Sequence, residues 1–326
     1  MGDAYREFIK ENLENTLKET NLPLLNQQVG KVRDTYQLND DELLMVTTDR
    51  QSAFDRVLAT IPFKGAVLNL VSAWWFEKTK SIIPNHLIKT IHPNASRVVK
   101  CDVFPIEVIV RGYITGTTST SLWTHYEQGE RLYCGNKLKE GLRKNEKLAE
   151  PLLTPTTKEA HHDRPISPNE IIAESWMSAD DWAYVAAKAR QLFAFGAQKA
   201  HEHGLILVDT KYEFGKDKEG NIRLIDELHT PDSSRYWLLD SYEERFKHHR
   251  EPENIDKEFL RLWFAKECDP YNAEILPKAP PELVEELSFR YIKLFEMITG
   301  EKFPFEEVIN SVDSLTDLLL QEVKHG

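Results

Sequence analysis

The sequence predicts an α+β fold, with antiparallel sheets flanked by helices. Short strand-like runs dominate the chain before residue 111, and a β-hairpin is expected over residues 205–228. Beyond residue 250 the apolar residues recur with the period of helices. We therefore expect two lobes, residues 1–110 and 111–326, of which the first is rich in strands and the second ends in helices.

Before residue 111 the patterns predict helices at both ends of a strand-rich stretch. One helix is expected over residues 5–19. Another is expected over residues 67–80, where apolar residues form one stripe: Val67, Leu70, Val71 and Trp74. Strands are expected at residues 31–38, 43–48, 57–61 and 103–111.

The middle of the chain divides into a polar stretch and a long helix. Residues 112–170 are polar, punctuated by Gly and Pro and poor in periodicity, so we expect functional loops there. Ser178 and Asp181 have the spacing of a helix N-cap, and Gly204 stands where a helix commonly ends. The long helix is therefore expected between Ser178 and Gly204.

The C-terminal part carries two apolar stripes at helical spacing. We interpret both as core packing and assign them no chemistry. They consist of Leu283, Leu287, Tyr291, Leu294 and Ile298, and of Val308, Val312, Leu315 and Leu319.

Charge and cysteine content narrow the classes of partner. The net charge is −12, which disfavours nucleic acid and anionic membranes as partners. The three cysteines have no paired spacing, which argues against disulfides or zinc and favours a reducing compartment. The N-terminal residues lack the features of a signal or transit peptide, and no apolar run is long enough to span a bilayer. We therefore expect a cytoplasmic protein without an obligatory protein partner.

The hairpin is the most informative segment for chemistry. Because side chains alternate across a strand, Asp209, Lys211 and Glu213 share one face, and the apolar start of the strand makes an ionic end costly unless it is paired. The second strand also ends in carboxylates, Asp226 and Glu227. Carboxylates brought together in this way suit Mg²⁺, and Lys211 suits a phosphate or carboxylate. The alternative is an exposed strand with surface ion pairs.

Three further segments carry weaker signals of anion binding. Lys31 and Arg33 follow Gly30 on one strand face, where triphosphate is a natural counterpart, although the spacing is not that of a Walker A loop. Taken alone, a basic pair on the surface is the commoner interpretation. Arg111 precedes a loop rich in Gly and hydroxyl groups, and Arg235 follows Asp232-Ser233-Ser234; both have the donors to bind phosphate, or could be solvated.

Taken together, these segments closely resemble the phosphoribosylaminoimidazole-succinocarboxamide synthase (SAICAR synthetase) family of purine biosynthesis. PIEVIVRGYITGT and LVDTKYEFG are similar to two family signatures. Further similar segments occur in family order between Gly30 and Trp237: GKVRDTY, TTDRQSAFD, IPFKGAVLN, LTPTTKEAHHD and DELHTPDSSRYW.

The resemblance implies a two-lobed, ATP-grasp-like or kinase-like fold with a cleft between the lobes. It also implies an ATP-dependent carbon–nitrogen ligase that joins L-aspartate to carboxyaminoimidazole ribonucleotide (CAIR), with Mg²⁺ as cofactor. A small-molecule kinase of related fold is the main rival, and a catalytically inactive nucleotide-binding protein is another. The two signatures and the DSSR segment favour the ligase.

The resemblance also implies roles for individual residues. Lys211 and Asp209 would lie at the reacting carboxylate, and Glu213 and Asp226 would hold Mg²⁺, with Glu227 as the open alternative to Asp226. ATP would contact Lys31, Arg33, Ser52, Asp55, Cys101 and Val103. Substrate binding would involve Arg111, Thr117, Ser234, Arg235, Lys158, His162 and Asp163. The family signature commonly has Ser where this chain has Thr117, so the hydroxyl is retained with an added methyl group.

Overall fold

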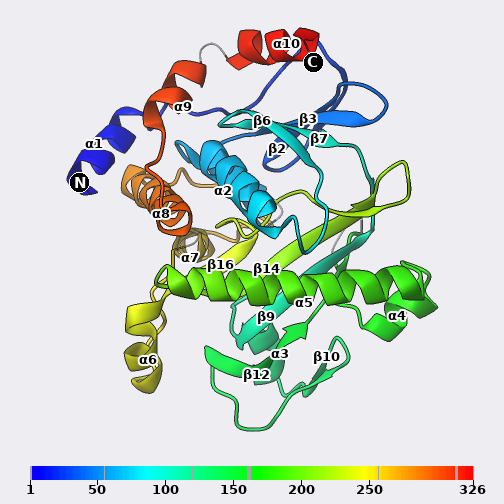
Figure 1. Cartoon of the computed structure of the whole chain (residues 1–326). Helices are drawn as coiled ribbons and strands as arrows, with labels where there is room; N and C mark the ends of the chain where they lie inside the picture. The colour runs from blue at the N-terminus through cyan, green and yellow to red at the C-terminus, as the bar shows by residue number, and fades with distance from the viewer. Residues whose placement is uncertain are drawn as a thin grey trace.

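Two antiparallel sheets, one above the other in Figure 1, form the frame of the computed structural model. The structure describes residues 2–54, 56–118, 120–159, 163–255, 257–312 and 315–325. Strands and helices lie in separate layers and the strand pairing within both sheets is antiparallel, which confirms the predicted α+β class.

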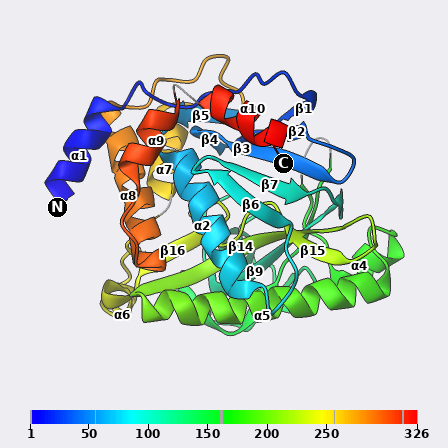
Figure 2. The same cartoon turned by 45° about the horizontal axis from the view of Figure 1, so that its top comes forward.

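The first sheet has five strands in the order β1-β2-β3-β7-β6. These are β1 (Leu25–Val29), β2 (Arg33–Gln37), β3 (Glu42–Thr47), β7 (Ala95–Val99) and β6 (Leu87–His92). Helix α2 (Lys64–Thr79) packs against β3, β6 and β7. A separate apolar cluster joins the sheet to Leu315 and Leu319 of α10 (Leu315–His325), which lies over this sheet in Figure 2.

The second sheet has seven strands and is built around β14 (Leu205–Lys216). Strands β9 (Ile106–Ile114), β15 (Ile222–Ile225), β16 (Ser234–Leu238) and β8 (Asp102–Val103) pair with β14, and β12 (Glu146–Leu153) and β13 (Thr156–Thr157) pair with β9. Helix α5 (Ala179–Glu202) packs along β14 and β9 (Figure 1).

Two hairpins and several helices complete the described chain. The hairpins are β4 (Arg50–Ala53) with β5 (Arg56–Thr60), and β10 (Leu132–Tyr133) with β11 (Asn136–Lys137). The remaining helices are α1 (Gly2–Glu11), α3 (Leu122–Glu127), α4 (Pro168–Ala173), α6 (Leu239–Lys247), α7 (Glu258–Glu267), α8 (Pro281–Thr299) and α9 (Phe305–Val312).

The N-terminal helix is shorter than predicted, since α1 ends at Glu11 rather than near residue 19. The backbone after it is bound by tertiary hydrogen bonds. The N–H of Leu17 donates to Asp49 and the N–H of Thr20 donates to Asp34, both at 2.8 Å. A helix would use these N–H groups internally, so the two buried carboxylates hold this segment out of the helix.

The interpretation of residues 112–170 as loops was wrong in part. The segment contains α3, α4, the β10–β11 hairpin and the eight-residue strand β12. Apolar and polar residues do not alternate along β12, because its register on β9 shifts between Lys147 and Leu152. Such a bulge displaces the side-chain period by one residue.

The long central helix and the hairpin are confirmed. The Ser178 side chain accepts a hydrogen bond from the N–H of Asp181, and Gly204 follows the helix with φ +74°. Strands β14 and β15 pair from Glu213↔Ile225 to Lys216↔Ile222.

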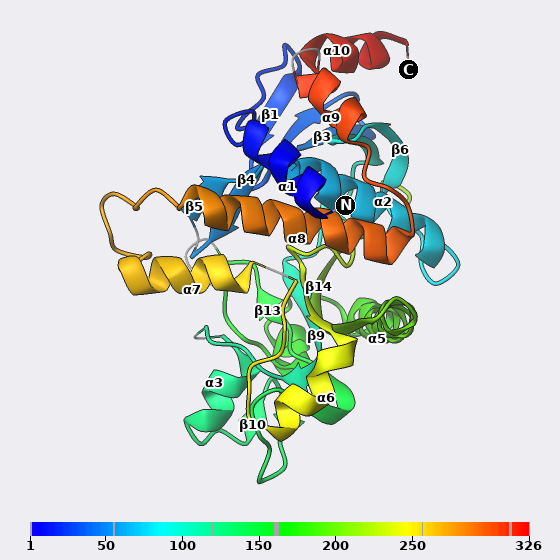
Figure 3. The same ribbon diagram turned by 90° about the vertical axis from the view of Figure 1, so that its left-hand side faces the viewer.

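The C-terminal helices pack back onto the first part of the chain. Leu287, Tyr291, Leu294 and Ile298 are buried along α8, as the stripe predicts, and α8 contacts α1 and α2. Figure 3 shows α7 and α8 at the level where the two sheets meet. The lobe boundary after residue 110 stays a prediction; strand β9 runs across it. Within the described residues, no helix combines the length and apolarity needed to cross a membrane.

Helix α5 packs closely against the loop after β15 at Gly196. A Cβ atom at Gly196 would lie 2.3 Å from Cε1 of His229, which is fully buried. The His229 ring is fixed by a 2.7 Å hydrogen bond between Nε2 and the Tyr212 hydroxyl, and by an edge contact with Trp75. This packing sets the position of the loop that carries Asp226.

We predict that Gly196→Ala destabilises the protein by about 1–3 kcal/mol, because the methyl group overpacks the site against a ring that cannot move away. The free energy of unfolding in urea measures this. Ala187→Gly, on the exposed side of the same helix, should cost about 1 kcal/mol through helix propensity alone. A Gly196→Ala protein that is more stable than wild type would show that helix propensity outweighs the contact.

Candidate active site

Strand β14 places the predicted chemistry in order along one line. Side chains two positions apart on a strand lie on one face about 7 Å apart. Asp209 contacts Arg111 and Arg235, Lys211 contacts Glu213, and Gly215 pairs with Val103 of β8. The contact between Lys211 and Glu213 confirms the predicted shared face. The centre therefore extends over about 20 Å from Asp209 to Gly215.

Lys211 lies among three carboxylates. Its ammonium is 3.1 Å from Glu107 and 3.8 Å from Asp226, and it also bonds Glu213. Burial opposes the charge of Lys211, but Glu213, Glu107 and Asp226 raise its pKa well above the usual value. Burial likewise opposes ionisation of Glu213, while Lys211 and Lys158 lower the pKa of Glu213 to about 2. Both groups are therefore charged at neutral pH.

The carboxylate of Asp226 is only partly compensated by the cations around it. Burial raises the pKa of Asp226 to about 6, and the charges of Glu213 and Glu227 act in the same direction, against Arg33 and Lys211. The cations present in the cluster therefore compensate this carboxylate only in part, and a further cation would be favourable there.

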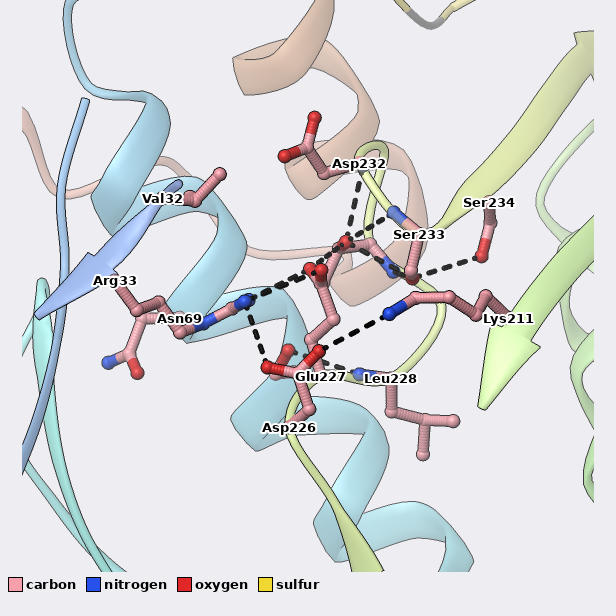
Figure 4. A network of polar contacts seen from close by, with 12 residues as sticks. Val32, Arg33, Asn69, Lys211, Asp226, Glu227, Leu228, Asp232, Ser233 and Ser234 are labelled. Carbon is pink, nitrogen blue, oxygen red and sulfur yellow. Dashed lines mark hydrogen bonds and ion pairs between the residues drawn. The ribbon is translucent and has the colours of Figure 1, made fainter. Parts of the chain in front are cut away.

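Asp226 and Glu227 lie just beyond the end of the second strand, whereas the sequence places them on it. Strand β15 ends at Ile225, and Asp226 adopts a left-handed backbone with φ +65°. The turn lets Asp226 and Glu227 both face Arg33, whose Nη1 and Nη2 lie 3.0 Å from Asp226 Oδ1 and Glu227 Oε2 respectively (Figure 4). The position of the two acids along the strand therefore gives no ground for choosing between Asp226 and Glu227.

Geometry distinguishes the two acids in another way. Asp226 Oδ2 faces Lys211, so Asp226 and Glu213 approach the same ammonium. Glu227 instead accepts hydrogen bonds from Thr230 and Arg33. Arg33 thereby ties the segment after Gly30 to the end of the hairpin, two segments that the sequence could only list separately.

The anion pocket, as we call it, is a cavity of about 200 Å³ at the Asp209 end of β14. Its cations come from three regions of the chain: Arg111, Lys211, Arg235, Lys257 and Arg261. Its acids are Asp209, Asp232 and Glu258, and its hydroxyl groups include Ser233 and Ser234. The lining has more cations than acids, which suits a phosphorylated or carboxylated ligand.

Asp209 holds the two predicted arginines of this pocket together. Its Oδ2 lies 3.3 Å from Arg111 and 2.6 Å from Arg235. Arg111 also donates from Nε to the Thr154 hydroxyl at 2.8 Å. Because both guanidinium groups are fixed by the same carboxylate, they line the pocket in a defined geometry.

A buried ionic hub at Asp232 was missed by the sequence analysis. Asp232 Oδ2 lies 3.0 Å from Lys64 at the start of α2, and Oδ1 lies 2.9 Å from Lys257 and 3.2 Å from the Tyr291 hydroxyl. Burial opposes ionisation, yet Lys257 and Lys64 hold the pKa of Asp232 well below its usual range. A lysine among the apolar residues of IPFKGAVLN was the available signal of a buried partner.

The hub corrects the interpretation that the C-terminal helices carry no chemistry. Lys257, Glu258 and Arg261, at the start of α7, line the anion pocket, and Tyr291 of α8 reaches Asp232. The stripe that contains Tyr291 indicates that its ring is buried but not that its hydroxyl contacts Asp232, and neither stripe includes residues 257–261.

The other predicted residues fall around these two centres. Lys158 bonds Glu213, the Ser234 hydroxyl donates to Thr210, and the Thr117 hydroxyl donates to Glu258 at 2.7 Å. The Ser52 carbonyl accepts from Lys257 at 3.3 Å, which places Ser52 on the side of the anion pocket. Lys31 and Asp163 are exposed, Cys101 and Val103 lie beside Gly215, and Asp55 and His162 lie outside the described residues.

Carboxylates and cations clustered along one strand, beside an anion pocket, define a class: an α+β enzyme that handles phosphorylated or carboxylated substrates. The model of the family described as SAICAR synthetase matches residues 26–277. A phosphoribosylaminoimidazole-succinocarboxamide synthase of Legionella pneumophila (strain Lens) is 59% identical over 309 residues, which cover 95% of this chain and 98% of the relative. This chain belongs to the SAICAR synthetase family.

Solved structures of the family share the fold. A SAICAR synthase from Saccharomyces cerevisiae complexed with SAICAR is similar with a TM-score of 0.74 and 34% identity, over 88% of this chain and 99% of that one. A SAICAR synthetase in complex with ADP is similar with a TM-score of 0.66 and 26% identity, over 86% of this chain and all (100%) of that one. The expected α+β fold of the family, with antiparallel sheets flanked by helices, is thus confirmed.

We predict that Asp232→Ala destabilises the protein by about 3–5 kcal/mol, because it leaves Lys64 buried without its carboxylate. Folding lowers the pKa of Asp232, so its ionised form stabilises the fold above about pH 4. The difference in free energy of unfolding between wild type and Asp232→Ala should therefore become smaller only as the pH falls below that value. Urea unfolding at pH 7 and at pH 3–4 measures both effects.

Asp41→Ala is the matched control, since Asp41 pairs with Lys218 at the surface. Its cost should be at most about 1 kcal/mol. Equal costs for the two variants would show that the hub contributes no more than a surface ion pair.

Proposed function

We propose that this chain joins L-aspartate to CAIR with consumption of ATP, giving SAICAR, ADP and phosphate. Its membership of the SAICAR synthetase family supports this activity. The observation that carries the proposal is the arrangement of β14, which brings the anion pocket, Lys211 and the carboxylates Glu213 and Asp226 into one continuous line.

The chemistry requires an anion-handling site of this kind. A carboxylate is a poor acyl donor because its leaving group would be oxide. Transfer of the γ-phosphoryl group to the CAIR carboxylate gives an acyl phosphate and ADP. The aspartate amine then attacks the acyl carbon, the C–N bond forms as the C–O bond to phosphate breaks, and the amine loses a proton. The protein acts mainly by positioning and by neutralising charge.

In this proposal the anion pocket binds the ribonucleotide. Arg111 and Arg235, fixed by Asp209, would bind its phosphate or carboxylate through charge-assisted hydrogen bonds. Ser234 and Thr117 would supply hydroxyl groups at the wall and the rim. Lys211 lines both the pocket and the carboxylate cluster, so it is suited to hold the reacting carboxylate where the phosphoryl group arrives.

Mg²⁺ fits the carboxylate cluster. Glu213 and Asp226 both approach Lys211, so their oxygens converge on a position that already holds a positive charge. Mg²⁺ binds through one or two carboxylates together with phosphate oxygens and water, so two side chains suffice. When bound, the ion would neutralise the phosphate charge during transfer. We favour Asp226 over Glu227, whose oxygens are engaged by Thr230 and Arg33.

ATP would lie along the Glu213–Gly215 half of the strand. The triphosphate would meet Lys31 and Arg33, and the base would lie near Cys101 and Val103, which border Gly215. Lys158 on Glu213 would neutralise charge from the opposite loop. Of the remaining expected residues, we propose that Ser52, Asp55, His162 and Asp163 border the substrates.

We further propose that the two predicted lobes bind different parts of the substrates, and that the protein is cytoplasmic. Residues 1–110 would supply the phosphate and nucleotide contacts, and residues 111–326 the Mg²⁺ and ribonucleotide contacts. ATP, CAIR and L-aspartate are the proposed partners. The unpaired spacing of the cysteines supports a reducing compartment.

The direct test is an assay with purified protein, Mg²⁺, ATP and CAIR. Phosphate release should require L-aspartate and should match SAICAR formation mole for mole. Release of phosphate at the same rate without aspartate would overturn the ligase proposal, and transfer of phosphate to a polyol would support the rival kinase.

We predict that Glu213→Gln lowers kcat by at least about 100-fold, because the neutral amide loses a Mg²⁺ ligand and the charge partner of Lys211. Circular dichroism should show a retained fold. Glu219→Gln, in the exposed turn of the same hairpin, is the control and should leave kcat within about twofold. Near-normal turnover of Glu213→Gln at saturating Mg²⁺ would contradict the ligand assignment.

We predict that Arg111→Ala raises KM for CAIR by about 10–100-fold, since charge-assisted hydrogen bonds to the ligand are lost. KM for ATP should change little. Arg131→Ala, at a half-buried arginine that pairs with Glu140 and does not line the anion pocket, provides the control. If Arg111→Ala changed only KM for ATP, Arg111 would be a contact of ATP and not of CAIR, which would contradict the assignment.

A further inference from the structure

Arg50, at the start of β4, has its whole guanidinium group committed to carbonyls of two backbone segments and to one carboxylate. Nη2 donates to the Gly30 carbonyl at 2.9 Å, and Nε donates to the Lys31 carbonyl at 3.3 Å. Nη1 donates to the Lys18 carbonyl at 2.7 Å, and Nη2 also lies 2.7 Å from Asp34 Oδ1. Arg50 is only 8% exposed, so these bonds form away from water.

The Gly30–Arg33 loop is held by all four of its carbonyls. Arg50 takes the first two. The Val32 carbonyl accepts from the N–H of Thr48 at 2.9 Å and from its hydroxyl, and the Arg33 carbonyl accepts from the N–H of Gly30 at 2.7 Å. A Cβ atom on Gly30 would lie 2.9 Å from that same Arg33 carbonyl oxygen, so the loop closes too tightly for any other residue.

The direction of the carbonyls fixes the direction of the amides. In a planar trans peptide, each C=O and the N–H of the next residue point to opposite sides. With the Gly30 and Lys31 carbonyls facing Arg50, the amides of Lys31 and Val32 point away from it. Gly30 and Lys31 are exposed, and Arg33 of the same loop reaches Asp226 and Glu227. The loop thus presents cations and amide dipoles beside the carboxylate cluster.

Asp34 keeps the guanidinium in place. The Asp34 side chain is fully buried, and its Oδ2 accepts from the N–H and the hydroxyl of Thr20 at 2.8 and 2.9 Å. The other oxygen of Asp34, Oδ1, accepts a hydrogen bond from Nη2 of Arg50. The carboxylate, the guanidinium and the carbonyls therefore form one chain of bonds from the N-terminal segment to the loop.

We propose that Arg50 is a positioning residue for the ATP triphosphate. By fixing the Gly30 and Lys31 carbonyls, it sets the loop so that Lys31 and the neighbouring amides face the phosphates. Arg50 itself touches no phosphate. This inference rests on the proposed function, because it takes ATP as the ligand of the loop.

Lysine cannot replace the arginine in this role. An ammonium is a single donor centre, whereas the guanidinium spreads its donors over a rigid plane that reaches Gly30, Lys31, Lys18 and Asp34 at once. Arg50→Lys keeps the charge beside Asp34 but should release the loop. The variant therefore separates pairing with the carboxylate from positioning of the carbonyls.

The test measures ATP and ADP binding by calorimetry in the presence of Mg²⁺, together with KM for each substrate. Arg50→Lys should weaken ATP binding by about tenfold or more and raise KM for ATP in parallel, with KM for CAIR within about twofold of wild type. Asp34→Asn should act in the same direction. Arg97→Lys is the matched control: it lies on β7 of the five-stranded sheet that contains β2, it is paired with Glu42, and it should leave ATP binding unchanged.

Chemical rescue separates positioning from general loss of structure. Arg50→Ala leaves a cavity shaped for a guanidinium ion, so millimolar guanidinium or methylguanidinium should restore much of the lost ATP affinity. The same additive should not improve ATP binding by Arg97→Lys. If Arg50→Ala does not fold, Arg50→Lys and Asp34→Asn decide the question.

A folded Arg50→Lys protein with wild-type ATP affinity would overturn the proposal, as would an equal rise in KM for all three substrates. Failure of the proposed function is a separate result. It would appear as wild-type protein that binds ATP but releases no phosphate in an aspartate-dependent manner.

Discussion

A buried charge is stable in a protein only beside an opposite charge, and this constraint organises the centre of the molecule. Lys211 is surrounded by Glu107, Glu213 and Asp226; Asp232 lies between Lys64 and Lys257. Each cluster includes a partner from a distant part of the chain, Glu107 for Lys211 and Lys64 for Asp232. Removing one partner would leave the others uncompensated, so each cluster fixes the relative positions of several elements as well as providing charge.

The groups that hold this part of the fold together are also those that we propose the substrates engage. Arg111 and Arg235 share Asp209, Arg33 bridges Asp226 and Glu227, and Lys158 is bonded to Glu213. Phosphates and a divalent cation can be exchanged into such a network with little change in the number of ionic contacts. The site is thus preorganised for anions, which is the condition under which fixed charges contribute most to catalysis.

Much of this centre could be predicted from the sequence, because its main signals are local. Alternation along residues 205–214 places Asp209, Lys211 and Glu213 on one face, and the N-cap at Ser178 and the glycine at 204 delimit the helix behind them. The motifs in family order add the function. The turn at Asp226 could not be predicted in this way, because its left-handed backbone depends on Arg33, which lies 193 positions earlier in the chain.

The parts that the sequence did not reveal share one physical cause: their partners are distant and their residue types are common. Lys257 and Arg50 look like ordinary surface cations until Asp232 and Asp34 are seen beside them. In the same way, helix α1 ends early because two buried carboxylates, on β2 and between β3 and β4, take backbone N–H groups of the segment that follows. A buried carboxylate can therefore decide both where a helix ends and where a neighbouring loop lies. Asp34 does both, since it binds the N–H of Thr20 on one side and Arg50 on the other.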